Sequence, residues 1–402
     1  MLLSFSFSNF ASFVEKTDLS LRLSTRDPVI GWDRYALTSQ RASTVVAIVG
    51  ANGAGKSSVL KAGSFLAWFI RESFAADPEA PLPFHPHMLH TKEPSRFELE
   101  LVDDDGTQWF YNLVTTTTQV QQETLRKRPI QGNVRSVFAR MWNSKAGAYV
   151  VSQPGVERRL PPSEAAKVRP NASFISVARQ YGLDVASGLQ GFRITSNLKT
   201  GDASSEWTAL TEAADHFHQA PESMNRARKL LTQLDLGLSN VELVAMETTT
   251  TPSPKMGGSP QRPTYYPLGI HNSSTNTFHL PFAWESAGTR AAFVLLRHLL
   301  DALATGTPAL IDEFDATLHP HMVEPILRLF DREETNPHGA QLVFTVQSPE
   351  VLSLLKPAQV LFVEKTECMS TAYRGDEIRG LKSNDNLYGK YMAGALGAVP
   401  HL

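Results

Sequence analysis

The sequence contains a single cysteine, Cys368, so no disulfide can form within the chain, and a reducing compartment fits this composition. Long apolar runs are also missing: the longest, such as Val45–Val49 and Pro308–Ile311, are far too short to span a bilayer. The first residues alternate in polarity and carry no basic group before their apolar part, which is unlike a signal peptide. These absences predict a cytoplasmic protein of bacterial type that does not engage a membrane.

An excess of charge of either sign is missing as well. The chain has 38 Lys and Arg against 40 Asp and Glu, for a net charge of −2, which excludes a polybasic nucleic-acid binder but not a local basic patch. No internal repeat and no sustained heptads occur, which argues against a long coiled coil. What is present is ordinary globular composition: 402 residues, 42% of them apolar, enough for one large or two ordinary domains.

Hydrophobic periodicity predicts strands that alternate with helices in the C-terminal part and an antiparallel hairpin near residue 105. The predicted strands are Leu3–Phe7, Thr44–Val49, Arg96–Val102, Gln108–Thr115, Gln119–Leu125, Ala309–Ile311, Gln341–Thr345 and Val360–Val363. The predicted helices are Ser57–Ser73, Trp207–Phe217, Ser223–Leu234, Gly288–Ala304, Met322–Arg332 and Pro349–Leu355. Residues 78–94 and 248–264 are predicted to be loops. The alternation indicates an α/β fold with a parallel, helix-covered sheet.

Residues 50–57 read GANGAGKS and match G-x-x-x-x-G-K-[ST] between a predicted strand and a predicted helix. Glycines in this loop let backbone N–H groups face a phosphate, and the helix adds its positive dipole end. Lys56 would reach the β- and γ-phosphates, and Ser57 would bind Mg²⁺. The alternative is a glycine-rich turn with a stray lysine. The predicted nucleotide-binding residues are Gly50, Ala51, Asn52, Gly53, Ala54, Gly55, Lys56, Ser57 and Ser58.

Two further segments carry chemistry. PALIDE at 308–313 is an apolar strand that ends in two acids: Asp312 would hold the Mg²⁺ shell, and Glu313 would act as general base toward the attacking water. Taken alone, such a pair is as well explained as the solvated end of a strand. ESAGT at 285–289 stands before a predicted helix, where Ser286, Gly288 and Thr289 could bind an anion, although a plain helix cap is the alternative.

These motifs resemble those of ABC-like ATPases of the SMC and OLD kin, and more closely the bacterial AAA family ATPases of the AbiLi and PtuA type, found in abortive-infection and Septu-like phage defence. The resemblance is carried by SFSNFASF (6–13), NGAGKS (52–57), ASFISVARQ (172–180), WESAGT (284–289), LIDEFDATLHP (310–320) and YMAGALGAVP (391–400). It implies an ABC-type P-loop ATPase head with a parallel core sheet, an antiparallel β subdomain and a helical insertion. We therefore expect the N-terminal half of the head at 1–155, a mainly helical insertion at 156–245 and the C-terminal half at 246–402.

The resemblance also implies a homodimer in which Ser286 and Gly288 of one subunit close over the γ-phosphate held by the other, opposite Lys56 and Glu313. Residues 316–318 would lie at the subunit seam. OLD-type nucleases carry a Toprim domain after this region, and the roughly fifty-five residues that follow Gln347 leave no room for one. An effector such as a nuclease or toxin is therefore expected to be a separate partner protein.

The sequence departs from the family pattern at two positions. Gln347 stands in TVQSP, at 345–349, where relatives carry a histidine, and Ala11 stands where they carry an arginine. Glutamine can donate a hydrogen bond to a phosphate oxygen or position water, but it cannot become charged. We keep Gln347 as a candidate catalytic residue and expect slow hydrolysis, or ATP that serves mainly to hold the dimer together.

Other candidates have simpler explanations. A metal site at His85, His87, His90, His319 and His321 is disfavoured because no cysteine or helically spaced acid accompanies these histidines. A basic cluster that could contact a nucleic-acid backbone comprises Arg126, Lys127, Arg128, Arg135 and Arg140, although such runs are usually solvated. Phe192, Trp207 and Phe217 are predicted to be core residues.

Three functions remain open from the sequence. The first is an ATP- and Mg²⁺-dependent dimeric switch in phage defence. The second is a DNA-repair or chromosome-handling ATPase that clamps nucleic acid. The third is a scaffold that binds ATP with little hydrolysis.

Overall fold

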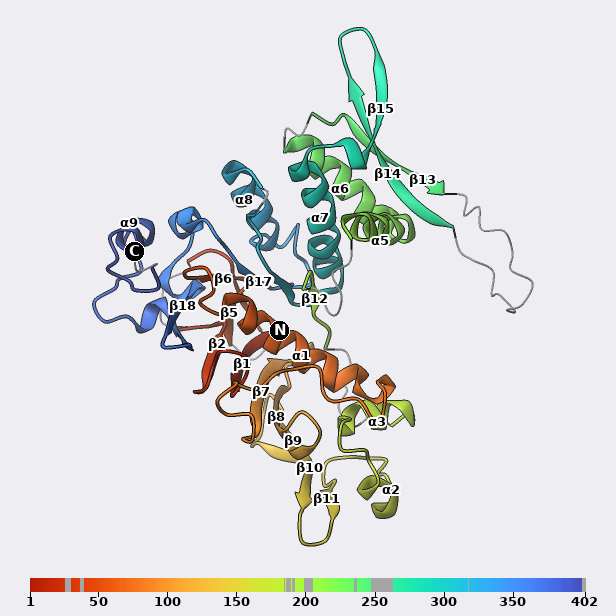
Figure 1. The fold of residues 1–402 in the computed structure, drawn as a ribbon, viewed down its shortest axis with the longest axis vertical. Coiled ribbons are helices and arrows are strands. Elements are labelled where there is room, and N and C mark those ends of the chain that lie inside the picture. The colour runs from red at the N-terminus through yellow and green to blue at the C-terminus, as the bar shows by residue number, and fades with distance from the viewer. Residues whose placement is uncertain are drawn as a thin grey trace, which may run out of the picture.

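The structure is a computed structural model (Figure 1). It describes residues 1–25, 30–36, 40–183, 185, 189, 192–198, 205–234, 237–246, 263–316 and 318–399. The loop predicted at 248–264 therefore lies outside the described residues except at its last two positions. Residue 317 of the expected subunit seam and residue 400 of the tail motif lie outside them too.

The strands are β1 (Leu2–Ser8), β2 (Thr17–Ser20), β3 (Arg22–Leu23), β4 (Asp33–Tyr35), β5 (Arg41–Ser43), β6 (Val45–Val49), β7 (Ser95–Val102), β8 (Gln108–Thr115), β9 (Val120–Arg128), β10 (Arg135–Asn143), β11 (Ala148–Ser152), β12 (Thr195–Ser196), β13 (Asn240–Met246), β14 (Thr264–Asn272), β15 (Thr277–Pro281), β16 (Ala309–Ile311), β17 (Leu342–Thr345), β18 (Val360–Thr366) and β19 (Met369–Arg374). The α-helices are α1 (Lys56–Glu72), α2 (Pro162–Ala166), α3 (Phe174–Gln180), α5 (Glu206–Gln219), α6 (Pro221–Gln233), α7 (Ala287–Thr305), α8 (Pro320–Leu327) and α9 (Leu387–Met392).

The core sheet has the strand order β12-β16-β17-β6-β18-β19. All neighbouring pairs run parallel except β18 and β19, which form an antiparallel hairpin. The carboxyl ends of β16, β17, β6 and β18 therefore meet at one edge of the sheet, where ligands bind in open α/β sheets. This edge positions the candidate site.

The second large sheet is antiparallel, with the order β11-β10-β9-β8-β7-β1-β2. It contains the predicted hairpin, in which Val102 pairs with Gln108. The third strand predicted at Gln119–Leu125 is present and continues to Arg128. The fold class predicted from the sequence is confirmed: an α/β protein with a parallel core sheet, an antiparallel β subdomain and inserted helices.

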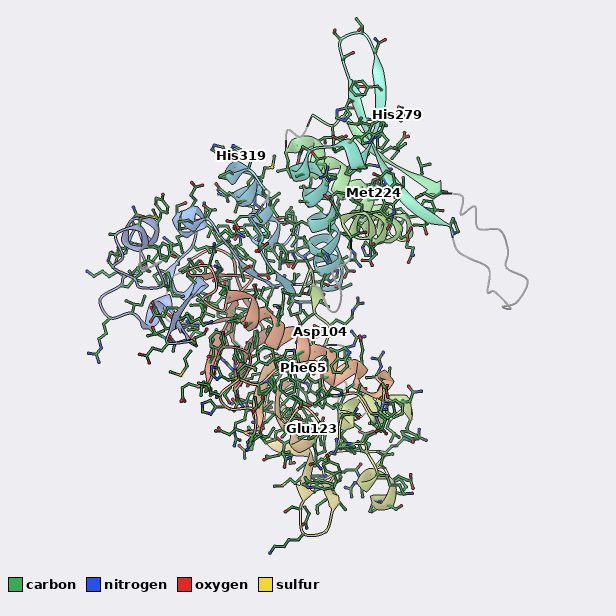
Figure 2. The ribbon with its side chains drawn as sticks, viewed as in Figure 1. Phe65, Asp104, Glu123, Met224, His279 and His319 are labelled. Carbon is green, nitrogen blue, oxygen red and sulfur yellow. The ribbon has the colours of Figure 1, made fainter. Side chains whose placement is uncertain are left out.

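Two hydrophobic cores share the core sheet, one on each face. In β6, Val46 and Ile48 pack into the first core, whereas Val45, Ala47 and Val49 pack into the second. This division follows from the two-residue side-chain period of a strand. The first core lies against the antiparallel sheet and contains Phe65 of α1, and the second lies among α5, α6 and α7 and contains Met224 (Figure 2).

The segment predicted as one insertion, 156–245, contributes to both cores. Its first part, which includes Val156, Phe174 and Phe192, packs into the first core, and its second part, which includes Phe217 and Leu231, packs into the second. A stretch that is continuous in the sequence is therefore divided between the two cores. The predicted domain boundaries stay a prediction.

A smaller sheet of β13, β14 and β15 extends beyond the helices, and the β14–β15 hairpin projects outward from the molecule, with His279 on β15 (Figures 1 and 2). Two expectations for the C-terminal half need correction. The helix predicted at Met322–Arg332 begins earlier, at Pro320, which suits the first turn, and it ends at Leu327 in a 3₁₀ turn. The predicted helix at Pro349–Leu355 is a 3₁₀ turn, Pro349–Ser353.

Trp207 is also not the core residue that was predicted. Its side chain is 45% exposed, and its ring stacks on Tyr266 at 4.5 Å between centroids, so one face of the indole is covered while the rest meets solvent. Phe192 and Phe217 are buried as predicted. Among the helices that the structure describes, none is long and apolar enough to cross a membrane.

Candidate functional site

The glycine-rich loop connects β6 to α1 at the carboxyl edge of the core sheet. Gly50 is packed so closely that a Cβ atom there would lie 2.1 Å from the carbonyl oxygen of Val363. Gly53 and Gly55 have φ angles of 76° and 115°, a region that side chains with a Cβ rarely adopt. The loop therefore needs these glycines to curl ahead of α1.

Because the loop curls in this way, several of its backbone N–H groups have no hydrogen-bond acceptor among the described residues. No described group accepts a hydrogen bond from the backbone N–H of Gly53, Gly55 or Lys56. The Lys56 amine folds back and donates to the carbonyl oxygens of Gly50, at 2.7 Å, and Ala51, at 3.2 Å. Burial lowers the pKa of this amine, while nearby carboxylates, chiefly Asp312, act against that shift. A cation and several free N–H groups at a helix N-terminus suit an anionic phosphate chain.

Asp312 lies at the end of β16, directly across from α1. Its Oδ1 accepts hydrogen bonds from Ser57 Oγ at 3.0 Å and Thr345 Oγ1 at 2.6 Å. Its backbone is held in both directions by Asn197, whose Nδ2 donates to the Asp312 carbonyl and whose Oδ1 accepts from the Asp312 N–H. Oxygen ligands from one hydroxyl and one carboxylate, fixed side by side, fit Mg²⁺, which keeps several waters and takes few protein ligands.

Glu313 follows in a left-handed backbone conformation, with φ 50°. Its N–H donates to Thr345 Oγ1 at 2.8 Å, and its Oε1 accepts from Gln347 Nε2 at 3.1 Å. Gln347 is fixed in turn by Asp315, which accepts from the Gln347 N–H at 2.9 Å. Both Glu313 and Gln347 are exposed to solvent. A base placed in this way can reach a water on the phosphate side, but the site around it is open.

One cavity of about 490 Å³ collects most of the predicted residues. It is lined by Ala11, Ser12, Ala51, Asn52, Gly53, Gly55, Lys56, Ser57, Ser58, Asp312, Glu313, Thr345, Gln347 and Lys365. Gly50 and Ala54 shape the loop from behind without lining the cavity. Ala11 does face it, and it brings no charge where the expected arginine would have brought one.

The ESAGT segment lies elsewhere: Ser286, Gly288 and Thr289 do not line this cavity in the described part of the chain. Ser286 caps α7, since its Oγ accepts from the Thr289 N–H at 3.1 Å. The Thr289 side chain is buried and bonded to Ser286, so it supports the cap. Ser286 itself is exposed, and the neighbouring Trp284 is 75% exposed.

Hydrogen bonds and ion pairs of Glu285 and Arg290 hold the ESAGT segment in place. Glu285 is buried and bonds His271 Nε2 at 2.7 Å, and Arg290 donates to the Glu285 carbonyl and bonds Glu206 at 2.6 Å. A stiff, exposed helix start next to a large exposed aromatic ring is suited to contact another molecule.

Several contributors to the site are not indicated by the sequence analysis, among them Thr345, Asn197 and Asp315. Thr345 ends a strand that was predicted, so its position at the same sheet edge as the acids was an available signal. Asn197 bonds a residue 115 positions away, and nothing in its local sequence indicates this. Asp315 belongs to a motif that was recognised, but its bonds to the Gln347 segment depend on the turn made at Glu313.

The basic cluster needs one correction. Arg140 is fully buried and cannot contact a nucleic acid. It donates to the carbonyl oxygens of Val168, Arg169 and Ala172 and lies 3.5 Å from Glu123, which is labelled in the lower lobe of Figure 2. This buried network ties β9 and β10 to the segment before α3. The remaining cluster residues, Arg126, Lys127, Arg128 and Arg135, reach the surface to different degrees.

The histidines have local roles. His87 accepts from the Leu89 N–H, His90 pairs with Glu93 at 2.8 Å, and His319 caps α8 by accepting from the His321 N–H. Among the residues described, no group of three or more His, Cys, Asp or Glu is placed to hold a metal ion.

Comparisons with solved structures return heads of SMC proteins. An SMC head bound to the C-terminal winged-helix domain of ScpA shares 13% identity over 93% of this chain and 97% of the other, with a TM-score of 0.46. The SMC head domain from Thermotoga maritima shares 14% identity over 93% and 98%, with a TM-score of 0.41. An SMC head with an extended coiled coil, bound to a ScpA domain derived from Pyrococcus furiosus, shares 12% identity over 93% and 96%, with a TM-score of 0.40. No curated protein matches the chain significantly.

A protein family does match, over residues 45–136 and 158–353. The match includes the glycine-rich loop, the acids at 312 and 313, and Gln347, which build the cavity, and it also includes the helix cap at Ser286, which lies outside the cavity. Because it spans most of the sequence, the chain belongs to the family described as "AAA domain, putative AbiEii toxin, Type IV TA system".

Proposed function

We propose that this protein binds and hydrolyses ATP with Mg²⁺ as a homodimer, and that this cycle switches a partner effector on or off in phage defence. The observation that carries the proposal is the cavity at the carboxyl edge of the core sheet. In one place it brings together Lys56, the Ser57–Asp312 pair and the Glu313–Gln347 pair.

Each residue has a role that its contacts support. Lys56 exchanges two backbone carbonyls for phosphate oxygens, and the free N–H groups of the loop bind the same chain. Ser57 and Asp312 would hold Mg²⁺, which would neutralise charge at the phosphates. Glu313 takes the proton of the attacking water, and Gln347 keeps the Glu313 carboxylate oriented.

The dimer explains two features that a single chain leaves unaccounted for. Glu313 and Gln347 are open to water, whereas efficient hydrolysis needs a closed site. Ser286 and Trp284 form an exposed, rigid surface outside the cavity. A second copy that places Ser286 over the phosphates would close the first cavity, and symmetry would close the other in the same way.

A mixing experiment tests this arrangement. Ser286→Asp keeps a good helix cap but sets a negative charge against the phosphates, so this variant and Lys56→Ala are each expected to be inactive alone. Mixed in equal amounts, they should regain about a quarter of wild-type turnover. Half of randomly paired dimers are then mixed, and each mixed dimer has one intact site of two. Steady-state phosphate release measures this.

The contrasting result is equally clear. If Ser286 acted on the cavity of its own chain, every protomer in the mixture would be defective, and no activity would return. Thermal unfolding of both variants shows whether they are folded. Mixing wild type with the Lys56→Ala, Ser286→Asp double variant shows whether subunits exchange, because mixed dimers then have no intact site and turnover falls from a half to a quarter of wild type as they form.

Gln347→His is expected to raise turnover about threefold to tenfold, because an imidazole can share a proton with Glu313 at the distance where glutamine only donates a hydrogen bond. Phosphate release at saturating ATP measures the effect. Gln347→Asn serves as the control, since it keeps the amide but cannot titrate. Turnover at or below the wild-type rate in the histidine variant would show that glutamine is not the cause of slow hydrolysis.

The role in defence rests on the family, whose description names a toxin of a type IV toxin–antitoxin system. We propose a cytoplasmic switch that restrains or releases a separate nuclease or toxin. A nucleic-acid clamp is the alternative, and the exposed Arg126 and Arg135 are the observation in its favour. DNA binding by the wild-type dimer that weakens steeply with salt would favour the clamp.

A further inference from the structure

Lys365 lies at the carboxyl end of β18, the strand next to β6, and its side chain lines the same cavity as the glycine-rich loop. It is exposed, and within the described residues it takes part in no ion pair and no side-chain hydrogen bond. The neighbouring Glu364 accepts from the Ala398 N–H, which places its carboxylate on the other side of the strand. Among the described residues, Lys365 is therefore a cation without an anionic partner, in a cavity built around a candidate anion site.

The strand register shows why this side chain points to the loop. Lys365 pairs with Ser370 across the β18–β19 hairpin, and cross-strand partners project from the same face of a sheet. Ser370 is buried, and its Oγ bonds the carbonyl oxygen of Ala54 at 2.6 Å and Ser12 Oγ at 2.7 Å. Its N–H also donates to the Ser12 carbonyl. The hairpin is thus anchored to the glycine-rich loop at the position opposite Lys365.

The order of the strands places Lys365 relative to the acids. Asp312 and Glu313 follow β16, two strands to one side of β6, whereas Lys365 is on β18, one strand to the other side. The cavity therefore has its negative charge at one end and Lys365 at the other, with Lys56 between them. A phosphate chain with its Mg²⁺-binding end at Asp312 would bring its inner phosphates toward Lys365.

We propose that Lys365 binds the phosphate chain of the nucleotide at the end away from Asp312, through the phosphates that ATP and ADP share. This rests on the proposed function. The positive charge at that end of the cavity then comes from Lys365 on the β18–β19 hairpin, because the lining residues Ala11 and Ser12 carry no charge. The contact is a charge-assisted hydrogen bond from an ammonium group to a phosphate oxygen.

The test is titration calorimetry of the full chain with ATP and with ADP. Lys365→Ala should weaken the binding of both nucleotides about fivefold to tenfold, slightly less than the full contribution of one hydrogen bond to a charged group, because the cavity is partly open to water. Lys365→Arg should remain within about twofold of wild type. Lys145→Ala is the matched control, because Lys145 is also an exposed lysine at a hairpin turn but lies outside the cavity, and it should bind like wild type.

The outcomes separate the two proposals. If wild type binds ATP, and Lys365→Ala binds ATP and ADP as tightly as wild type does, the role of Lys365 is refuted while the proposed function stands. A loss confined to ATP would contradict its placement at the shared phosphates. If wild type binds no nucleotide, the proposed function fails and this inference fails with it. The unfolding temperature of Lys365→Ala should match that of wild type, because the side chain makes no bond that folding needs.

Discussion

Lys56→Ala is expected to abolish ATP binding, with affinity reduced at least about a hundredfold. Among the described residues that line the cavity, Lys56 is the cation at its centre. Hydrogen bonds to charged groups contribute about 1.5–3 kcal/mol each, so two lost phosphate contacts account for this factor. The chain should still fold, because the carbonyls of Gly50 and Ala51 that Lys56 now contacts can bond water in an open cavity. Titration calorimetry with ATP measures the loss.

Lys145→Ala is the control for removal of a lysine charge, and it should bind ATP like wild type. In cells that carry the protein with its native neighbouring genes, Lys56→Ala should also remove protection in a phage plating assay. Undiminished ATP binding by Lys56→Ala would refute the assignment of the loop. Loss of binding with undiminished protection would refute the switch in defence and leave the nucleotide site intact.

Glu313→Gln is expected to bind ATP but to hydrolyse it about a hundredfold to a thousandfold more slowly, within the range contributed by a positioned general base. The amide keeps the shape of the side chain and its contact with Gln347, and it removes a negative charge next to the phosphates. ATP should therefore be held longer and the closed dimer should accumulate. Single-turnover phosphate release gives the rate, and light scattering with and without ATP gives the mass.

Glu333→Gln, at an exposed position outside the cavity, controls for the change of charge and should hydrolyse ATP at the wild-type rate. If Glu313→Gln hydrolyses as fast as wild type, another group is the base. If it hydrolyses slowly but stays monomeric with ATP, Glu313 keeps its role and the shared site between two copies is wrong.

Those parts of the site that depend on contiguous residues could be predicted from the sequence. The glycine-rich loop needs a buried strand, three special backbone positions and a helix start, all within Thr44–Ser57. The acids at 312 and 313 follow a strand that is apolar throughout because helices cover both of its faces. Such patterns are local, and the structure places these segments at one sheet edge because parallel strands share that edge.

The parts that could not be predicted depend on contacts between distant segments. Arg140 looks like a surface charge in a basic run, and only the return of the chain at residues 168–172 supplies the carbonyls that bury it. Asn197 reaches Asp312 only because the short strand β12 pairs with β16. Lys365 reaches the cavity through the register of β18 with β19, and a register is not visible in either strand alone.

The sharing of the core sheet between two hydrophobic cores limits how this protein can change over evolutionary time. Substitutions at Val46 and at Val45 change the packing of different cores. The lobe with the antiparallel sheet and the lobe with the helices can therefore diverge in sequence largely independently. A residue inserted within β6 has no such freedom, because it would exchange every following side chain between the two cores and shift the glycine-rich loop by one position. Variation in length should therefore collect in the connections, whereas the strand that leads into the loop keeps its length.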